Sequence, residues 1–151
     1  MMKYSKMSIR YGVRIALALI AYFLLMRVSG LLEVYWLRLL NGVIMGYGIY
    51  KVVQACKIES QEYFSSFEAF AAGIRSGVLA TFIFVVFVFV YMFLIDPAFS
   101  SKMMQIVGWE TTNPIRMILI VILIEGIGSS VVLSLTFIQL FKTSNNILEN
   151  T

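Results

Sequence analysis

A near-continuous apolar segment between Ile115 and Phe141 most constrains what this chain can fold into. A helix needs about 20 apolar residues to cross the hydrocarbon core of a bilayer, so this segment is long enough to span a membrane. One acidic residue, Glu125, lies near its middle. A charged side chain at that depth costs about 2.5–3.5 kcal/mol on insertion scales, which makes Glu125 the first candidate for a functional role.

Composition also indicates a membrane protein. Hydrophobic residues make up 60% of the chain and charged residues 13%, against roughly 45–50% and about 25% in soluble domains. Lysine and arginine exceed aspartate and glutamate by 12 to 8. Because the basic residues flank apolar runs and do not form one basic face, we expect the lipid bilayer as a partner and no nucleic acid. The length of 151 residues predicts a single transmembrane domain.

Four apolar runs predict an all-α integral membrane bundle of four transmembrane helices. The expected spans are residues 11–28, 34–53, 74–95 and 115–141, with a helix start near Phe67 for the third. The third span carries aromatic and β-branched residues on every face, which fits either the most central or the most lipid-exposed position.

The first span has a second interpretation. Its uncharged part, Ile15–Met26, is short and follows a basic start, which is typical of a cleaved signal peptide. No small-x-small cleavage motif follows it, and Arg14 and Arg27 can snorkel to opposite interfaces. We therefore expect a retained helix.

Local signals mark the starts of the later helices. Ser65 and Glu68 have the spacing of a capping box, and Asn113 precedes Pro114 as an N-cap precedes a first-turn proline. Asp96-Pro97 repeats that arrangement, and Gly108 can end a helix. These signals predict a short outer interfacial helix over residues 97–107, between the third and fourth spans. Residues 142–151 are expected to form a short polar tail.

Basic residues also predict the orientation. Eight flank the side of the N-terminus, the second loop and the C-terminus: Lys3, Lys6, Arg10, Arg14, Lys51, Lys57, Arg75 and Lys142. Four flank the other side: Arg27, Arg38, Lys102 and Arg116. The positive-inside rule therefore predicts cytoplasmic N- and C-termini, and Trp36 and Trp109 fall on the outer interface, where indole rings prefer to lie.

Small residues at four-residue spacing predict the helix-packing faces, since helices in a bilayer associate through close backbone approach. They are Gly42 and Gly46 in the second span, Gly73 and Gly77 in the third, and Gly126, Ser130 and Ser134 in the fourth. These faces can pack one chain into a bundle, or they can form a homo-oligomer or an interface with another membrane protein.

Three short motifs resemble a known family. They are Tyr11-Gly12, the stretch Ser66-Phe67-Glu68-Ala69-Phe70 with Gly73 and Gly77 after it, and Ile95-Asp96-Pro97-Ala98-Phe99. They are similar to small bacterial inner-membrane proteins grouped as domain of unknown function 4199. The resemblance implies a four-helix, multi-pass protein of the bacterial inner membrane and carries no activity or catalytic residues.

Catalytic chemistry has little support in the sequence. The chain has no histidine and one cysteine, so we expect no metal site, no cofactor and no enzyme. Ser129 lies one helical turn from Glu125, and a hydrogen bond between them is geometrically easy. We expect Ser129 to solvate the carboxyl group, which is a simpler role than that of a nucleophile.

Glu125 itself allows three interpretations. It is a neutral, hydrogen-bonded carboxyl inside the bundle, it pairs with a cation of this chain or a partner, or it takes part in proton or cation transport. Arg27, Arg38 and Arg116 lie nearer the outer interface, so pairing within the chain requires a long reach or a tilted helix. The sequence favours an accessory, assembly or structural subunit of the envelope, with a small transporter or channel subunit that uses Glu125 as the alternative.

Overall fold

The computed structural model describes residues 2–31, 34–60 and 65–146, and every regular element among them is helical. The elements are α1 (Met2–Val28), the 3-10 helix η1 (Tyr35–Arg38), α2 (Leu39–Glu59), α3 (Ser66–Val90), the π-helix η2 (Tyr91–Ile95), α4 (Pro97–Val107) and α5 (Pro114–Asn146).

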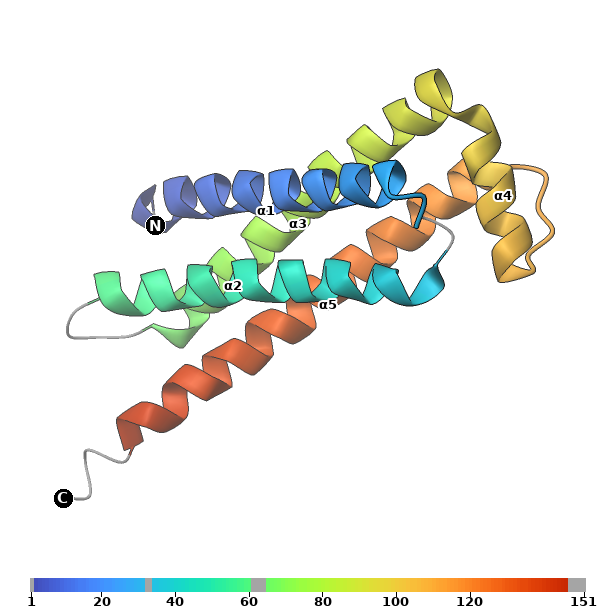
Figure 1. Cartoon of the computed structure of the whole chain (residues 1–151). Coiled ribbons are helices and arrows are strands. Elements are labelled where there is room, and N and C mark those ends of the chain that lie inside the picture. The colour runs from blue at the N-terminus through green and yellow to red at the C-terminus, as the bar shows by residue number, and fades with distance from the viewer. Residues whose placement is uncertain (1, 32–33, 61–64, 147–151) are drawn as a thin grey trace.

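The long helices α1, α2, α3 and α5 run alternately in opposite directions (Figure 1). The start of α1, the end of α2, the start of α3 and the end of α5 lie at one end of the molecule, which we call the terminal end. The short helix α4 lies at the opposite end, the α4 end (Figure 1). The sequence expectation that the two termini share a side with the second loop is consistent with this arrangement.

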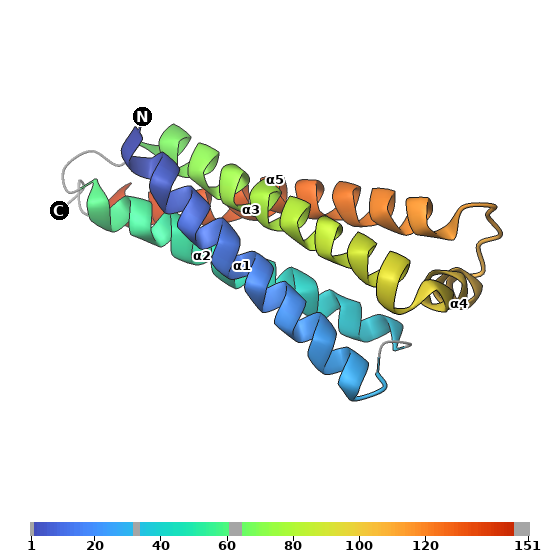
Figure 2. The same ribbon diagram turned by 90° about the horizontal axis from the view of Figure 1, so that it is seen from above.

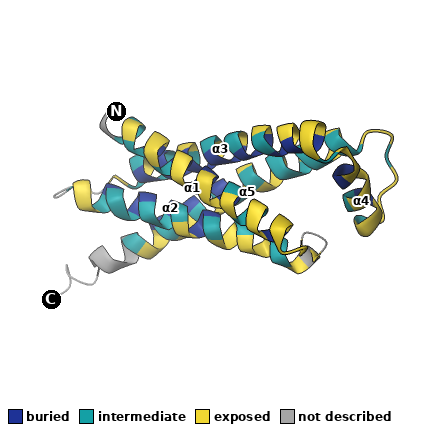
Figure 3. Cartoon of the chain, turned by 45° about the horizontal axis from the view of Figure 1, so that its top comes forward, coloured by how far each residue is buried: buried dark blue, intermediate teal, exposed yellow. Residues whose placement is uncertain are grey.

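Helix α3 is the central element, because it packs against α1, α2 and α5. Its buried side, which includes Ala72, Ala80 and Val88, faces these helices, whereas Phe82 is 61% exposed on the other side (Figure 3). Of the two positions left open by its sequence, α3 takes the central one and keeps one exposed face.

Three of the described helices combine the length and the apolar composition needed to cross a membrane: Tyr4–Val28, Ser66–Ile95 and Pro114–Phe141. Helix α2 is not in this set, although its 21 residues make it about 32 Å long at 1.5 Å per residue. Asn41, Lys51 and Gln54 lower its hydropathy. The first residues of the expected 34–53 span also form η1, so α2 begins only at Leu39.

The cap signals mark where α3 and α4 begin. Ser65 Oγ accepts a hydrogen bond from the Glu68 N–H at 3.3 Å, and α3 starts at Ser66. Asp96 Oδ1 accepts from the Phe99 N–H at 3.2 Å. Helix α4 then runs over Pro97–Val107 to Gly108, whose φ of 73° is left-handed. These bounds of α4 coincide with those expected from the sequence.

Other boundaries differ from the sequence expectation. Helix α1 begins at Met2 and not near residue 11, because the residues before the apolar run include no glycine or proline that would stop a helix. Helix α5 continues to Asn146, so the expected polar tail is helical over 142–146, and 147–151 lie outside the described residues. The α5 start coincides with Pro114, and the Asn113 carbonyl oxygen accepts a hydrogen bond from the Met117 N–H at 3.2 Å. The side-chain amide of Asn113 donates to Thr112 Oγ1 at 3.3 Å.

The small residues of α3 and α5 face each other in one antiparallel register. A Cβ atom placed on Gly73 would collide with Ser134, and one on Gly77 would collide with Ser130. One turn further along, a Cβ atom on Gly126 would collide with Thr81. Each step of four residues forward in α3 is matched by a step of four backward in α5, so the two helices touch nearly backbone to backbone.

A similar close approach joins α1 to α3. A Cβ atom on Gly12 would lie 2.9 Å from the Ser76 carbonyl oxygen. The Ser76 side chain is fully buried, and its hydroxyl shares its one proton between two carbonyl oxygens, that of Ala72 at 2.8 Å and that of Ser8 at 3.1 Å. The central helix is therefore fixed on two sides by small residues.

Gly42 and Gly46 of α2 are packed differently. No atom lies within 4 Å of a Cβ placed on Gly42, and Gly46 makes only an ordinary contact with Leu133 at 3.5 Å. The expected packing face of the second span is thus loosely filled by this chain, and Gly42 borders a cavity instead.

Phe23 of α1 ties the α4 end together. Its ring makes edge contacts with Phe84, Phe87, Tyr91 and Phe99, with centroids 5.0–6.3 Å apart. Such pairs favour a fixed arrangement of the rings. They connect α1 to α3, η2 and α4.

Candidate functional site

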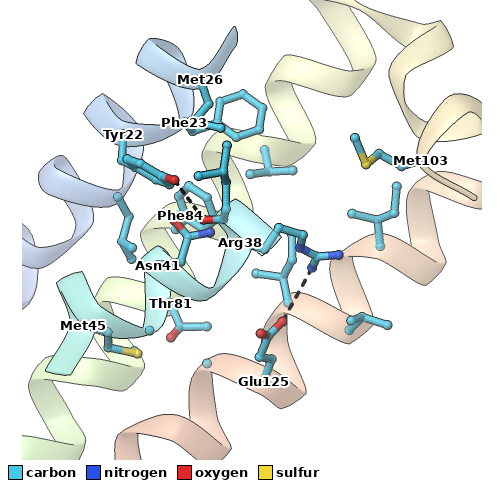
Figure 4. Close-up of a pocket in the computed structure, with 18 of the residues that line it drawn as sticks. Tyr22, Phe23, Met26, Arg38, Asn41, Met45, Thr81, Phe84, Met103 and Glu125 are labelled. Atoms are coloured by element: carbon cyan, nitrogen blue, oxygen red, sulfur yellow. Dashed lines mark hydrogen bonds and ion pairs between the residues drawn. The ribbon is translucent and has the colours of Figure 1, made fainter. Parts of the chain in front are cut away.

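A cavity of about 250 Å³ lies toward the α4 end, between α1 and α2 on one side and α3, α4 and α5 on the other. Figure 2 shows that the ribbons of α1 and α2 diverge from those of α3 and α5 toward this end. Most of the lining is apolar, with Phe23, Met26, Phe84 and Met103 among the wall residues (Figure 4). The divergence of the two helix pairs is what leaves this space unfilled.

An ion pair crosses the cavity. Arg38 Nη2, at the end of η1, lies 3.6 Å from Glu125 Oε2 of α5 (Figure 4). The side chains are 36% and 60% exposed, respectively. A hydrogen bond between a cationic nitrogen and a carboxylate oxygen normally measures 2.7–2.9 Å. The pair is therefore a loose ionic contact, and the carboxylate keeps much of its surface available.

Uncharged polar groups lie beside this pair. The Tyr22 hydroxyl donates to the Leu37 carbonyl oxygen at 2.8 Å and so holds α1 against the start of η1–α2. The Asn41 Oδ1 atom is buried and has no hydrogen-bond partner among the described residues. This oxygen has almost no accessible surface, so it faces the packed interior and not the open part of the cavity.

Glu125 and Ser129, the two candidates from the sequence, both line the cavity. The carboxylate points toward Arg38, and no hydrogen bond joins it to Ser129 among the described residues. Of the three interpretations of Glu125, the geometry is that of an ion pair within the chain. Ser130, the next residue, donates to the Gly126 carbonyl at 2.6 Å and belongs to the helix-packing face.

Sequence reasoning placed Arg38 too far from Glu125, and it missed Asn41 and Tyr22. The reason is the different lengths of the helices. Helix α5 has 33 residues, or about 50 Å, and Glu125 lies about 16 Å along it from Pro114. The shorter α2 begins level with Glu125, which brings Arg38 beside it. The different lengths of the two helices are the feature that could have indicated this contact.

A second ion pair lies at the α4 end of the molecule. Arg27 Nη2 of α1 lies 2.8 Å from Asp96 Oδ2, and its guanidinium carbon lies 5.9 Å from the centre of the Tyr91 ring. Asp96 also caps α4, so one carboxylate fixes both α4 and α1. Together the two ion pairs connect η1 to α5 and α1 to the start of α4.

The site shows groups for binding more clearly than groups for catalysis. Among the described residues, no three His, Cys, Asp or Glu side chains come together as metal ligands would. The one cysteine, Cys56, is buried in α2 and does not line the cavity. The described lining residues offer a largely apolar wall, one cation and one anion.

Comparisons with known proteins do not assign the chain to a family. No protein-family model, no curated protein sequence and no solved structure matches the chain. The resemblance to the four-helix bacterial family stays a prediction from the sequence motifs.

Proposed function

We propose that the chain is a non-catalytic, multi-pass protein of the bacterial inner membrane that crosses it four times and serves as an accessory or assembly subunit of an envelope complex. On this proposal α2 crosses the membrane together with α1, α3 and α5, and both termini are cytoplasmic. Two features support α2 as a span: it lies side by side with three candidate spans, and its length of about 32 Å matches a hydrocarbon core of about 30 Å.

The exposed α2–α5 face is the observation that carries the accessory role. Only 11% of the most apolar window of α5 is buried by the chain itself, against 39% for α3. A groove between α2 and α5 is lined by Gly42, Gly46 and Ser129 and flanked by Val43 and Val132. Gly42 has nothing within 4 Å of an added Cβ, and such an open small residue allows another helix to approach closely. A transmembrane helix of a partner or of a second copy fits this groove.

Photo-crosslinking in native membranes tests this role. We expect a photoreactive amino acid at Val43 or Val132, which are 64% and 62% exposed, to give a discrete crosslinked product. The matched control is Phe82, which is 61% exposed on α3 and does not line the groove. Equal labelling at Phe82, or only uncrosslinked monomer at Val43 and Val132, would contradict the proposal.

The 60% exposure of the Glu125 side chain favours a second candidate, a transporter or channel subunit built around this carboxylate. On that alternative, purified protein in vesicles carries a proton or cation flux that Glu125→Gln abolishes while expression is unchanged. The accessory role predicts no flux above that of empty vesicles at any pH tested.

A further inference from the structure

The charges of the described residues that line the cavity balance each other. Arg38 and Glu125 are the only Lys, Arg, Asp or Glu side chains among its described lining residues. A ligand with a single net charge would be attracted by one of them and repelled by the other. A neutral molecule that carries one charge of each sign can complement both.

The loose geometry of the ion pair leaves room for such a molecule. At 3.6 Å, the Arg38–Glu125 contact is longer than a charge-assisted hydrogen bond, and 60% of the Glu125 side chain is exposed. A ligand ammonium with N–H groups can donate to the exposed Glu125 carboxylate, and a phosphate can lie beside the Arg38 guanidinium.

The walls and the size of the cavity indicate the rest of the ligand. The rest of the lining is largely apolar, with Phe84, Val88 and Met103 among its side chains. The volume of about 250 Å³ is below the 300–1,000 Å³ of sites that enclose a whole drug-sized ligand. The cavity is therefore suited to a head group whose hydrocarbon chains extend outside. Trp109 lines the cavity, and indole rings prefer the depth of the lipid head groups.

We propose that this cavity binds the head group of a zwitterionic phospholipid with a primary amine, with its phosphate at Arg38 and its ammonium at Glu125. The inference goes beyond the accessory role, which concerns the outer α2–α5 groove and needs no ligand. It also specifies a selectivity. A quaternary ammonium has no N–H to donate to Glu125, and an anionic head group places a second negative charge beside Glu125.

Native mass spectrometry of the full-length protein in detergent tests this selectivity. The probes are dioleoyl phosphatidylethanolamine, phosphatidylcholine and phosphatidylglycerol, added in equal amounts. We expect the phosphatidylethanolamine adduct to exceed each of the others roughly tenfold, as the loss of hydrogen bonds to a charged group implies. Equal adducts of all three lipids, or a preference for phosphatidylglycerol, would overturn the proposal.

Two leucine variants locate the binding. Gly42 borders the cavity and has nothing within 4 Å of a Cβ, so Gly42→Leu fills space without a clash inside the chain. Gly128 of α5 has equally open surroundings and lines neither the cavity nor the groove. We expect Gly42→Leu to abolish the preferred adduct and Gly128→Leu to retain it, with similar thermal unfolding midpoints. Retention of the adduct by both variants would place the lipid elsewhere and overturn the proposal.

Glu125→Gln tests the electrostatic part. It removes the negative charge but keeps the shape of the side chain, so the preference for phosphatidylethanolamine over phosphatidylglycerol should fall roughly tenfold or more. Arg75→Gln, at an exposed arginine outside the cavity, should leave the preference unchanged. An unchanged preference in Glu125→Gln would contradict the assignment of the ammonium to this carboxylate.

Discussion

Gly77→Leu should destabilise the folded protein by about 3 kcal/mol or more, the largest effect that we expect from any single substitution outside the cavity. A Cβ atom at Gly77 would collide with Ser130, which is 0% exposed, and would lie 3.3 Å from Ile49 Cδ1. Overpacking in a filled core costs about 1–3 kcal/mol and sometimes more. Here the added side chain must also separate two helix backbones. The free energy of unfolding, measured by denaturing-detergent titration in mixed micelles, reports the loss.

Gly128→Leu is the matched control, because it places the same side chain on a membrane helix where nothing lies within 4 Å of the new Cβ. It should change the free energy of unfolding by less than about 0.5 kcal/mol. A second comparison uses the size of the facing residue. Gly77→Ala combined with Ser130→Gly should be more stable than the two single changes predict, because neighbouring sites are coupled. Equal stability of Gly77→Leu and Gly128→Leu would contradict the α3–α5 register.

Asp96→Ala should have the next largest effect, about 2 kcal/mol. The carboxylate accepts the Phe99 N–H at the start of α4 and pairs with Arg27 at 2.8 Å, and its side chain is only 18% exposed. Loss of an N-cap costs about 1 kcal/mol. The ion pair adds roughly up to 1 kcal/mol, since the Arg27 side chain is 46% exposed and partly screened. The same denaturing-detergent titration measures the change.

Two further variants separate these contributions. Asp96→Asn keeps an acceptor for the α4 cap but removes the charge, so it should lose only about half as much stability as Asp96→Ala. Arg27→Gln should match Asp96→Asn, and the double variant should be no worse than either. Glu110→Ala, at an exposed acidic residue of the same end, is the control and should be neutral. Additive losses in the double variant would mean that the pair does not contribute.

The starts of α3, α4 and α5 could be predicted from the sequence because they depend on local chemistry. Ser65 and Asp96 act through hydrogen bonds three residues long, and Pro114 fits only the first turn of a helix. The ends were harder to predict. Helix α5 continues to Asn146 because no glycine or proline stops it after the apolar run. Local patterns also say little about η2, where the helix widens into a π-helix before Asp96.

The small residues predicted which faces could pack, but not which helix each would meet. Gly73 and Gly77 meet Ser134 and Ser130 because α3 and α5 are antiparallel neighbours, a relation that spacing within one helix does not contain. Gly42 has the same spacing from Gly46, yet no neighbour fills it. Which helix each packing face contacts depends on how the whole chain packs.

Glu125 could be singled out from the sequence because a lone carboxylate in an apolar run is costly. Its partner could not be identified that way. Arg38 reaches it because α2 begins beside the middle of the longer α5, so the contact depends on the relative positions of two helices. Asn41 was missed for a similar reason: whether its side-chain oxygen is buried and has a donor depends on how the helices pack around it.

Cysteine accessibility across the membrane tests the central claim, four spans with α2 as one of them, most directly. In a Cys56→Ala background, single cysteines would replace Ser29, before α2, and Ser60, directly after it. We predict that a membrane-impermeant thiol reagent labels Ser29→Cys from outside intact cells, as it does Ser101→Cys in α4. Ser60→Cys should react only after the membrane is permeabilised. Labelling of Ser29→Cys and Ser60→Cys from the same side would contradict the four-span account.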